Sequence, residues 1–312
     1  LVSDQINDIE VLQNQSVWVA TNAGINVLRA GDRQIIRRYQ YGFDNWQGIS
    51  DPEIRDIYED DIGGLWLSTP LSGVNLFHEA DNLFEYYGQK SFEAKDNELL
   101  DAAVISITAD PEKERILIGS RKGISAYHYE LQSFSHYPFI ANDEQYSNQV
   151  FSICAIGNDR YLLGTENGLY QWDNQRKNYR ELPFSAENVQ VNEVYEDLAG
   201  NIWIGTKNNG LWKQNIQNSV YAPVGISTDE QPGNSSILEV NDIIQRPDSS
   251  MWVGTTKGLF RLKGEEMELY DFMPLTNSQP WVNHIAMTPD GSLLLSTRQH
   301  GLLKVAADNQ SS

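Results

Sequence analysis

The sequence predicts an all-β fold, a seven-bladed β-propeller of four-stranded antiparallel blades, and a repeated phrase carries most of that prediction. The phrase consists of an apolar triplet, a small residue, a hydroxyl residue and a turn that closes on glycine. Its fullest copy, NIWIGTKNNG, runs from Asn201 to Gly210. Periods of about 40 to 50 residues are typical of propellers and solenoids. The hydroxyl residues of the seven copies, separated by 48, 51, 45, 41, 49 and 42 residues, are Thr21, Thr69, Ser120, Thr165, Thr206, Thr255 and Thr297.

Each repeat contains signals for four strands. An alternating apolar and polar run, such as 191–195, precedes an Asp- and Gly-containing turn, and alternation of period two predicts a strand. The phrase itself is the second strand, the residues after its glycine are the third, and a looser aromatic run such as 178–182 is the fourth. Periods that vary by ten residues disfavour a solenoid, whose turns stack in register, and favour blades with variable end loops.

Seven such units account for all 312 residues, so we expect one propeller and no second domain. The seventh unit shows three strands without a clear fourth, and the first already owns its outer strand at 34–40. Either three strands close the ring, or the missing strand belongs to residues outside this sequence. The approximate blade boundaries are 1–45, 46–95, 96–142, 143–186, 187–233, 234–278 and 279–312.

Two positions of the phrase are predicted to serve packing and turn geometry. A bulky side chain at the small position would hold neighbouring blades apart. The closing glycines are expected to have positive φ, which a Cβ would penalise. The small residues are Ala20, Ser68, Gly119, Gly164, Gly205, Gly254 and Ser296.

The composition restricts the partners of the chain. It has 23 basic and 43 acidic residues, a net charge of −20, which disfavours nucleic acid and anionic lipid. No run of eighteen apolar residues is present. Because the chain starts at Leu1, we expect a fragment or a mature product. Cys154 excludes an internal disulfide and is expected to be a small buried hydrophobe.

The repeat resembles the two-component regulator propeller repeat. Residues 196–211, EDLAGNIWIGTKNNGL, match its pattern nearly throughout, and 59–73 match with one extra turn residue. The other five copies are degraded but remain in phase along the whole chain.

The resemblance implies an extracytoplasmic, periplasmic sensing domain cut from a longer membrane sensor. Members of that family often combine two propellers, a β-sandwich, a transmembrane helix and a histidine kinase or diguanylate cyclase output, and several sense oligosaccharides. It therefore implies a second propeller, a β-sandwich and an output domain as partners, a homodimer in the full-length receptor, and no catalytic activity or cofactor in this part.

A candidate ligand face follows from the strand order. If the first strand starts at the axis, the loops leading into it and the turns between second and third strands share one face. Those turns hold five cations and one anion, which predicts a basic ring for an anionic ligand such as an acidic or sulfated glycan. Carboxylates in the adjoining loops, at 51, 53, 101, 143, 144 and 239, could neutralise it. The candidate ligand residues from the turns are Arg121, Lys122, Lys207, Asn208, Lys257, Arg298 and His300.

Two tryptophans add a stacking surface for sugar rings on the same face. Trp46 and Trp281 lie in loops that lead into first strands and complete the candidate site. The remaining six tryptophans fall within second or third strands and are expected to pack between blades.

Enzymatic and interaction functions remain alternatives. The carboxylates at 59–61 and 196–197 recur at the same turn, which favours a turn role in which Asp accepts backbone N–H groups. The five histidines show no metal-binding spacing, and no nucleophile elbow or phosphate loop occurs. Convergent carboxylates near the axis would favour a glycosidase or lyase, a pocket lined by the turn cations would favour a sensor, and a platform for protein interactions or dimerisation is the third possibility.

Overall fold

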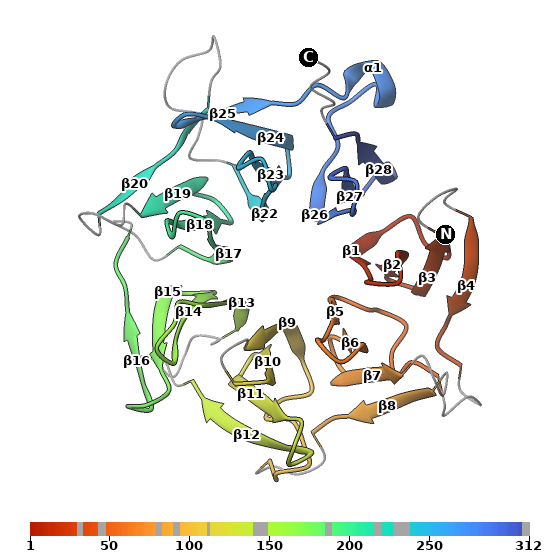
Figure 1. Cartoon of the computed structure of the whole chain (residues 1–312), viewed down its shortest axis with the longest axis vertical. Coiled ribbons are helices and arrows are strands. Elements are labelled where there is room, and N and C mark those ends of the chain that lie inside the picture. Colours follow the sequence, from red (N-terminus) through yellow and green to blue (C-terminus); the bar gives the residue numbers. More distant parts are fainter. Residues whose placement is uncertain are drawn as a thin grey trace.

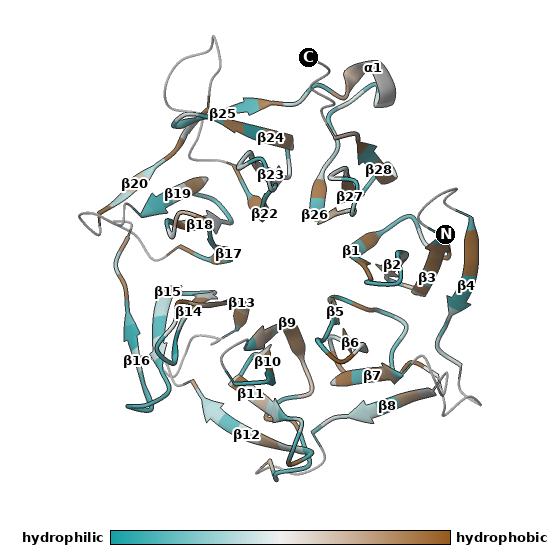
Figure 2. Ribbon diagram, in the orientation of Figure 1, coloured by the Kyte–Doolittle hydropathy of each residue, from teal (hydrophilic) through white to brown (hydrophobic). Residues whose placement is uncertain are grey.

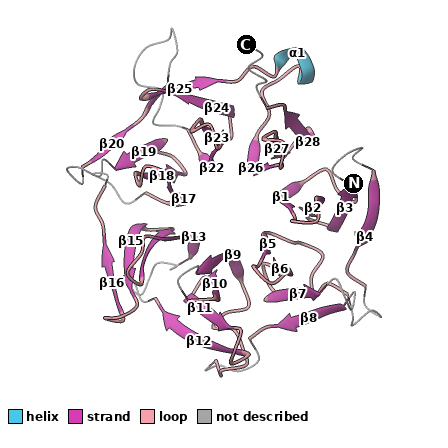
Figure 3. Ribbon diagram, in the orientation of Figure 1, coloured by secondary structure: helices cyan, strands magenta, loops and turns pink. Residues whose placement is uncertain are grey.

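The structure, a computed structural model, describes residues 1–29, 34–42, 48–78, 83–89, 94–110, 113–139, 149–184, 189–214, 220–226 and 238–307. It is a seven-bladed β-propeller, as the sequence predicts, with the blades arranged around a central channel (Figure 1; Figure 3). Within each blade consecutive strands pair antiparallel, from the axis outward.

The strands are named here by their distance from the axis. The inner strands are β1 (Ile6–Val11), β5 (Ile57–Glu59), β9 (Val104–Asp110), β13 (Val150–Ala155), β17 (Val191–Glu196), β22 (Val240–Gln245) and β26 (Val282–Met287). The second strands are β2 (Ser16–Thr21), β6 (Gly64–Ser68), β10 (Arg115–Ser120), β14 (Arg160–Thr165), β18 (Ile202–Thr206), β23 (Met251–Thr255) and β27 (Leu293–Thr297). The third strands are β3 (Gly24–Arg29), β7 (Val74–His78), β11 (Gly123–His128), β15 (Gly168–Asp173), β19 (Leu211–Gln214), β24 (Gly258–Lys263) and β28 (Gly301–Val305). The outer strands are β4 (Ile35–Tyr39), β8 (Leu83–Tyr87), β12 (Ser133–Pro138), β16 (Asn178–Glu181), β20 (Tyr221–Pro223) and β25 (Glu266–Leu269).

The seventh blade has three strands within the described residues, β26, β27 and β28. The strand β4 pairs with β3 of the first blade and does not complete the seventh, in agreement with the sequence analysis. Two elements were not predicted. The two-residue strand β21 (Gly225–Ile226) runs parallel to β25 at the edge of the sixth blade, and a one-turn helix α1 (Met273–Thr276) joins the sixth blade to the seventh.

The hydroxyl residue of each phrase closes the turn between the second and third strands. In all seven copies its side-chain oxygen donates a hydrogen bond of 2.7–2.9 Å to the carbonyl of the closing glycine. It also accepts a backbone N–H from inside the turn, as Thr255 does from Lys257 at 3.0 Å. The closing glycines have φ between 64° and 133°, which confirms the prediction that this position needs a residue without Cβ.

The four glycines at the small position, Gly119, Gly164, Gly205 and Gly254, face the next blade. A Cβ added to Gly205 would lie 2.6 Å from Cγ1 of Val240, the first residue of the next inner strand. The equivalent distances are 2.9 Å from Gly164 to Val191 and 2.8 Å from Gly254 to Val282. These contacts agree with the predicted need for close approach of neighbouring blades.

We expect Gly205→Val to lower the free energy of unfolding by about 1–3 kcal/mol, because the added atoms overpack a seam that already excludes a Cβ. Urea denaturation followed by tryptophan fluorescence measures the loss. Gly225→Ala is the matched control, because a Cβ there meets nothing closer than 3.9 Å, and its expected effect is within about 0.5 kcal/mol. Equal losses from the two variants would contradict the packing role of the small residue.

The recurring carboxylates of the turns between first and second strands are structural, as the sequence predicts. Asp197 Oδ1 accepts the backbone N–H groups of Ala199 and Asn201 at 3.0 and 2.8 Å. Its Oδ2 accepts the indole N–H of Trp203 at 2.9 Å, and Asp60 holds Trp66 in the same way at 2.8 Å. The tryptophan of the phrase is therefore oriented by the turn that precedes it.

The core is divided into wedges between adjacent blades rather than gathered at one centre. The cluster of Ile6, Ile9, Val19, Ala286 and Leu294, for example, joins the last blade to the first. The four phrase tryptophans are at most 4% exposed, which confirms their packing role. The outer strands β16 and β20 are hydrophilic, whereas β4 has a hydrophobic half (Figure 2). No helix in the described part of the chain is long and apolar enough to cross a bilayer.

Candidate functional site

The face that carries the turns between second and third strands is called the upper face. It also carries the beginnings of the inner strands, because successive strands are antiparallel. Eight of the predicted ligand residues lie on it, in the third, fifth, sixth and seventh blades. Trp46 lies outside the described residues. Six of the eight are exposed, whereas Trp281 and His300 are half-buried.

The upper-face cations have mostly local partners. Arg121 Nη2 lies 3.4 Å from Asp101 Oδ1, so one of the loop carboxylates does neutralise a predicted cation. Lys122 and Lys207 donate instead to the side-chain oxygens of Gln89 and Gln190, at 3.3 and 3.4 Å.

Two predicted residues of the seventh blade are brought together on this face. The Arg298 guanidinium lies over the Trp281 ring, 4.5 Å from its centroid, a cation–π geometry. Beside them, His300 Nε2 lies 3.0 Å from Ser278 Oγ. The Trp281 indole ring and the Arg298 guanidinium thus already lie one over the other on the upper face.

A cavity of about 280 Å³ lies on the axis, inside the central channel. Its walls are formed mainly by the second and third residues of the inner strands, and Arg55 and Asp56, which directly precede β5, take the equivalent places in the second blade. In six blades the register shifts at the second residue. None of the eight described candidate residues lines this cavity, so the predicted surface and the channel are separate features. Its lining includes Asn7, Asp8, Arg55, Asp56, Ser106, Ser152, Asn192, Glu193, Asn241, Asp242, Asn283 and His284.

Asparagines at the second position tie four of the blades to the next one. Asn241 Nδ2 donates to the Val282 carbonyl at 2.8 Å, and Asn283 Nδ2 donates across the closing seam to the Ile6 carbonyl at 2.7 Å. Asn7 and Asn192 make the same contact, and Ser106 Oγ replaces it in the third blade at 3.1 Å.

Side chains at the third position also reach the next blade, and together they are called the channel ring. Asp8 Oδ2 accepts the Ile57 N–H at 2.6 Å, and Asp56 Oδ2 accepts the Ile107 N–H at the same distance. Ser152 and Asp242 accept from the following blades at 3.1 and 2.6 Å. The channel ring consists of Asp8, Asp56, Ser106, Ser152, Glu193, Asp242 and His284.

His284 closes the channel ring electrostatically. Its Nδ1 lies 2.6 Å from Asp8 Oδ1 in the first blade, and its Nε2 lies 3.5 Å from Asp242 Oδ2 in the sixth. Burial disfavours the charged imidazole, but the charges of Asp8 and Asp242 outweigh burial and raise the pKa of His284 well above its ordinary value. Burial also opposes ionisation of Asp8, yet the charge of His284 lowers the pKa of Asp8 below its usual value.

Two other carboxyl groups of the channel ring, those of Glu193 and Asp56, favour their protonated forms. Burial and the charge of Asp242 raise the pKa of Glu193 to about 8. Burial and the charge of Asp8 raise the pKa of Asp56 well above its usual value. At neutral pH the channel thus holds the ion pair of His284 and Asp8 together with a protonated Glu193. The described residues contain no cluster of His, Cys, Asp and Glu arranged to hold a metal ion.

The sequence analysis missed the channel ring. A signal was available, because a polar residue stands thirteen positions before the hydroxyl residue in six repeats and fourteen before it in the third. Its members differ in type, from Asp to Ser, Glu and His, so they do not form a recognisable motif. Alignment of the repeats on their hydroxyl residues would have exposed them.

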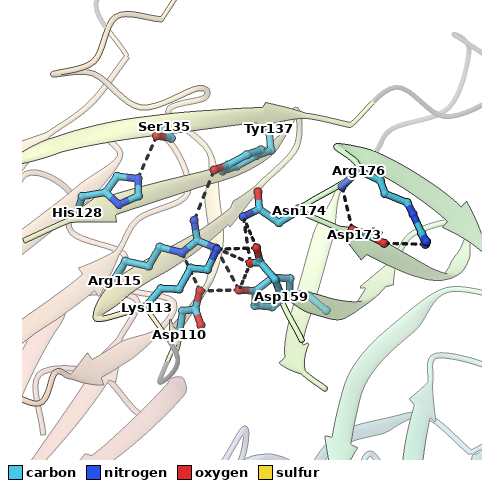
Figure 4. Close-up of polar contacts among 11 residues, drawn as sticks. Asp110, Lys113, Arg115, His128, Ser135, Tyr137, Asp159, Asp173, Asn174 and Arg176 are labelled. Atoms are coloured by element: carbon cyan, nitrogen blue, oxygen red, sulfur yellow. Dashed lines mark hydrogen bonds and ion pairs between the residues drawn. The ribbon is translucent and has the colours of Figure 1, made fainter. Parts of the chain in front are cut away.

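A second cluster of charged groups lies between the third and fourth blades, near the opposite, lower face (Figure 4). The Arg115 side chain is 2% exposed and its Nε lies 2.7 Å from Asp110 Oδ2. Tyr161 OH donates to the same oxygen and accepts from Arg115 Nη2 at 3.0 Å. Lys113 and Asn174 hold Asp159 beside them. This network fastens one blade to the next through buried charges, and we assign it to stability.

Comparisons with known proteins identify the fold. No protein-family model matches the chain, and no curated protein sequence matches it. Among solved structures, an extracellular domain assigned to a hybrid two-component system of B. thetaiotaomicron matches 97% of this chain with a TM-score of 0.78 and 20% identity. Virginiamycin B lyase from Staphylococcus aureus matches 98% of it with a TM-score of 0.74 and 13% identity.

A second extracellular domain, also assigned to a B. thetaiotaomicron hybrid two-component system, has a TM-score of 0.53 and 16% identity over 96% of this chain. This chain spans 40% of the first sensor domain and 46% of the second, but 96% of the lyase. Identities of this size establish the propeller fold, which sensor domains and an enzyme share.

Proposed function

We propose that this propeller is a non-catalytic sensing domain of an extracytoplasmic signalling receptor, with its ligand site on the upper face. The resemblance of the repeat and the fold shared with extracellular domains of two-component systems support the sensing role. The periplasmic location, a second propeller and β-sandwich in the same chain, an output domain and a homodimer of the full-length receptor belong to the same proposal.

The observation that carries the ligand site is the contrast between the fixed and variable parts of the upper-face turns. The hydroxyl residue and the glycine make the same hydrogen bond in every copy. The residues between them differ, and they place exposed cations such as Lys207 and Lys257 on a chain of net charge −20. An anionic oligosaccharide fits this surface, with a sugar ring near Trp281 and acidic groups near the cations.

The test is thermal-shift screening of the folded protein against neutral and acidic oligosaccharides. A ligand that binds only the folded state at 100 times its Kd stabilises that state by about 2.7 kcal/mol, which raises the Tm by several degrees. We expect acidic oligosaccharides to raise the Tm and the double variant Lys207→Glu, Lys257→Glu to abolish the shift.

Lys177→Glu is the matched control, because Lys177 is an exposed cation in the β15–β16 turn on the lower face. We expect it to retain the shift. If no oligosaccharide shifts the Tm but another domain of the receptor does, the propeller is an interaction or dimerisation platform instead.

The channel ring favours one alternative, a propeller glycosidase or lyase. Glu193 keeps its proton near neutral pH, as a general acid must, and it lies among other carboxyl groups on the axis. Most members of the channel ring already bind the backbone of the next blade, which favours a structural role. Turnover of a glycan that Glu193→Gln abolishes, with folding and binding retained, would establish the enzyme.

A further inference from the structure

The seventh blade ends in an edge that no strand of the described residues covers. Its outermost strand is β28, whereas the other six blades add a fourth strand outside the third (Figure 1). As far as the described residues run, the chain that leaves β28 does not fold back along it, because the Ala307 N–H donates to Ser292 Oγ on the lower face at 3.3 Å. The amino-terminal residues lie elsewhere, since the Val2 N–H donates to Asn26 Oδ1 in the first blade at 3.0 Å.

Each of the six four-stranded blades places a large side chain opposite the residue that follows the closing glycine. In the sixth blade the Tyr270 N–H donates to the Leu259 carbonyl at 2.8 Å, and the ring centroids of Tyr270 and Trp252 lie 5.7 Å apart. Leu182 and Val224 fill this place in the fourth and fifth blades. Tyrosines fill it in the other four, and they are Tyr39, Tyr87, Tyr137 and Tyr270.

Leu302 is the residue that such a side chain would cover in the seventh blade. Its six equivalents, such as Leu259, are at most 1% exposed, whereas Leu302 is half-buried. A cavity of about 20 Å³ adjoins it, between the seventh and first blades, with an apolar lining of Val17, Leu28, Leu294 and Leu302. Leu294 stands where the sixth blade has Trp252, so packing is incomplete at the place where the side chain of a fourth strand belongs.

The composition of β28 is that of a covered strand rather than of an edge strand. Edge strands usually carry charges, because unpaired N–H and C=O groups are otherwise a template for another chain. The outer strands β4 and β25 follow this rule, with Arg37 and Arg38 on one and Glu266 and Glu268 on the other. The strand β28, GLLKV, has one charge in five residues, and it therefore resembles the third strands that are paired on both sides.

The backbone groups of Leu302 and Lys304 face the open edge. Leu259 binds the outer strand of its blade, and alternate residues of an antiparallel strand turn their backbone groups to the same side. Leu302 and Lys304 hold the places of Leu259 and Arg261 in the repeat. Each therefore offers an N–H and a C=O group to a further antiparallel strand.

The ring does not need this further strand for its closure. The contacts of Asn283 with Ile6 and of His284 with Asp8 already join the seventh blade to the first near the axis. A fourth strand can therefore bind and leave without opening the propeller, which suits a reversible partner.

The sixth blade shows which strand chemistry the edge accepts. Its β25 places Glu268 opposite Arg261, and Lys304 is the equivalent cation of the seventh blade. Lys304 Nζ also lies 3.3 Å from Asp290 Oδ2, but the Asp290 side chain is 62% exposed, and such surface pairs are weak. The β28 strand of a second copy does not fit, because it offers neither a carboxylate nor an aromatic side chain.

We propose that the open edge of β28 is a docking site for one extended segment of a partner protein, which adds as an antiparallel fourth strand. The segment places an aromatic side chain opposite Leu302 and a carboxylate opposite Lys304. Addition of a strand to a sheet edge, with backbone hydrogen bonds for affinity and alternate side chains for specificity, is a recurring mode of peptide recognition. The site is separate from the upper-face ligand site, because none of the candidate ligand residues belongs to β28.

The probe is a fluorescein-labelled peptide that copies residues 265–271, EEMELYD, which include the outer strand of the sixth blade. Fluorescence anisotropy at increasing protein concentration should show saturable binding. The change Tyr270→Ala in the peptide should weaken binding about tenfold, because the aromatic side chain opposite Leu302 is lost.

Two N-methylated peptides test the strand pairing itself. N-methylation of Tyr270 removes the donor to the Leu302 carbonyl and should weaken binding at least about tenfold. N-methylation of Leu269 is the matched control, because its N–H points away from the third strand, and it should leave the affinity within about twofold.

Lys304→Pro locates the site on the protein. Proline removes the N–H that faces the open edge and keeps the pairing with β27, and we expect about a tenfold loss of peptide affinity. Lys304→Ala is the matched control, because it removes the same charge but keeps the N–H, and its expected loss is at most about threefold. Urea denaturation followed by tryptophan fluorescence checks that both variants fold.

Three results with the peptides would overturn the proposal: no saturable binding, equal affinities of the two methylated peptides, or unchanged binding by a folded Lys304→Pro variant. If Lys304→Pro fails to fold, the methylated peptides decide. A dimer of the free protein that Lys304→Pro dissociates would also overturn it, because β28 would then hold a second copy.

Discussion

Arg115→Ala should lower the free energy of unfolding by about 3–5 kcal/mol, because it leaves Asp110 as a buried carboxylate without its cation. Asp110 is 1% exposed and would retain only the Tyr161 hydroxyl at the same oxygen. The guanidinium also lies 6.0 Å from the centroids of both Tyr161 and Trp172, so its loss opens space between the two blades. Urea denaturation at neutral pH measures the change.

The double variant Arg115→Ala, Asp110→Ala distinguishes an unpaired charge from lost packing. Removal of both charges should recover part of the stability, since the penalty arises chiefly from the carboxylate left behind. Arg176→Ala is the surface control, because Arg176 pairs with Asp173 while 79% exposed, and such pairs contribute at most about 1 kcal/mol. Similar effects of Arg115→Ala and Arg176→Ala would refute the role assigned to the buried network.

His284→Gln should lower the free energy of unfolding by roughly 1–3 kcal/mol near pH 6 and by less above pH 8. This estimate is reduced for solvent screening, because the imidazole is partly exposed to the channel. The folded pKa of His284 is raised, so its contribution is complete below the unfolded value near 6.5 and is lost as the pH rises through the folded pKa. Glu193 also makes the protein less stable as the pH rises. Its pKa is about 8 in the folded state and 4.5 in the unfolded state, so the folded state binds a proton more strongly between these pH values.

Denaturation curves of the native protein and the variant at pH 6 and 8.5 give the comparison. We expect the native protein to be more stable at pH 6, with a smaller difference between the two pH values in His284→Gln. His128→Gln is the control of opposite sign, because burial and then the charge of Arg115 lower the pKa of His128, whose contribution is lost as the pH falls. A pH dependence unchanged by His284→Gln would show that His284 is not the group that titrates.

The fold could be predicted from the sequence because its determinants are local and repeated. A small residue directly precedes the hydroxyl residue in every copy, and a glycine follows it by three or four positions, so seven weak signals add up to one architecture. Even the three-stranded seventh blade was visible as a missing fourth run. The helix α1 was not, since a single turn over 273–276 has no periodicity.

The sites were harder to predict because they depend on differences between copies. The carboxylates of Asp8 and Asp242 stabilise the protonated form of His284. They lie 276 and 42 positions away from it along the chain. The structure places the predicted cations on the upper face, where their role as ligand residues stays a prediction, and the partners of Arg121 and Arg298 became evident only in three dimensions.

The side-chain contacts that line the channel run from each blade to the following one, in one direction around the axis. This direction determines how the protein can unfold. Asparagine and carboxylate side chains of one blade satisfy backbone groups of the following blade, and Asn283 and His284 return the sequence of contacts to the first. An open array of repeats can fray from its ends, because a terminal unit touches one neighbour only. A closed ring has no terminal unit, and loss of any blade would leave backbone groups of the next without partners. Unfolding should therefore be a single cooperative event, with no stable species of five or six blades.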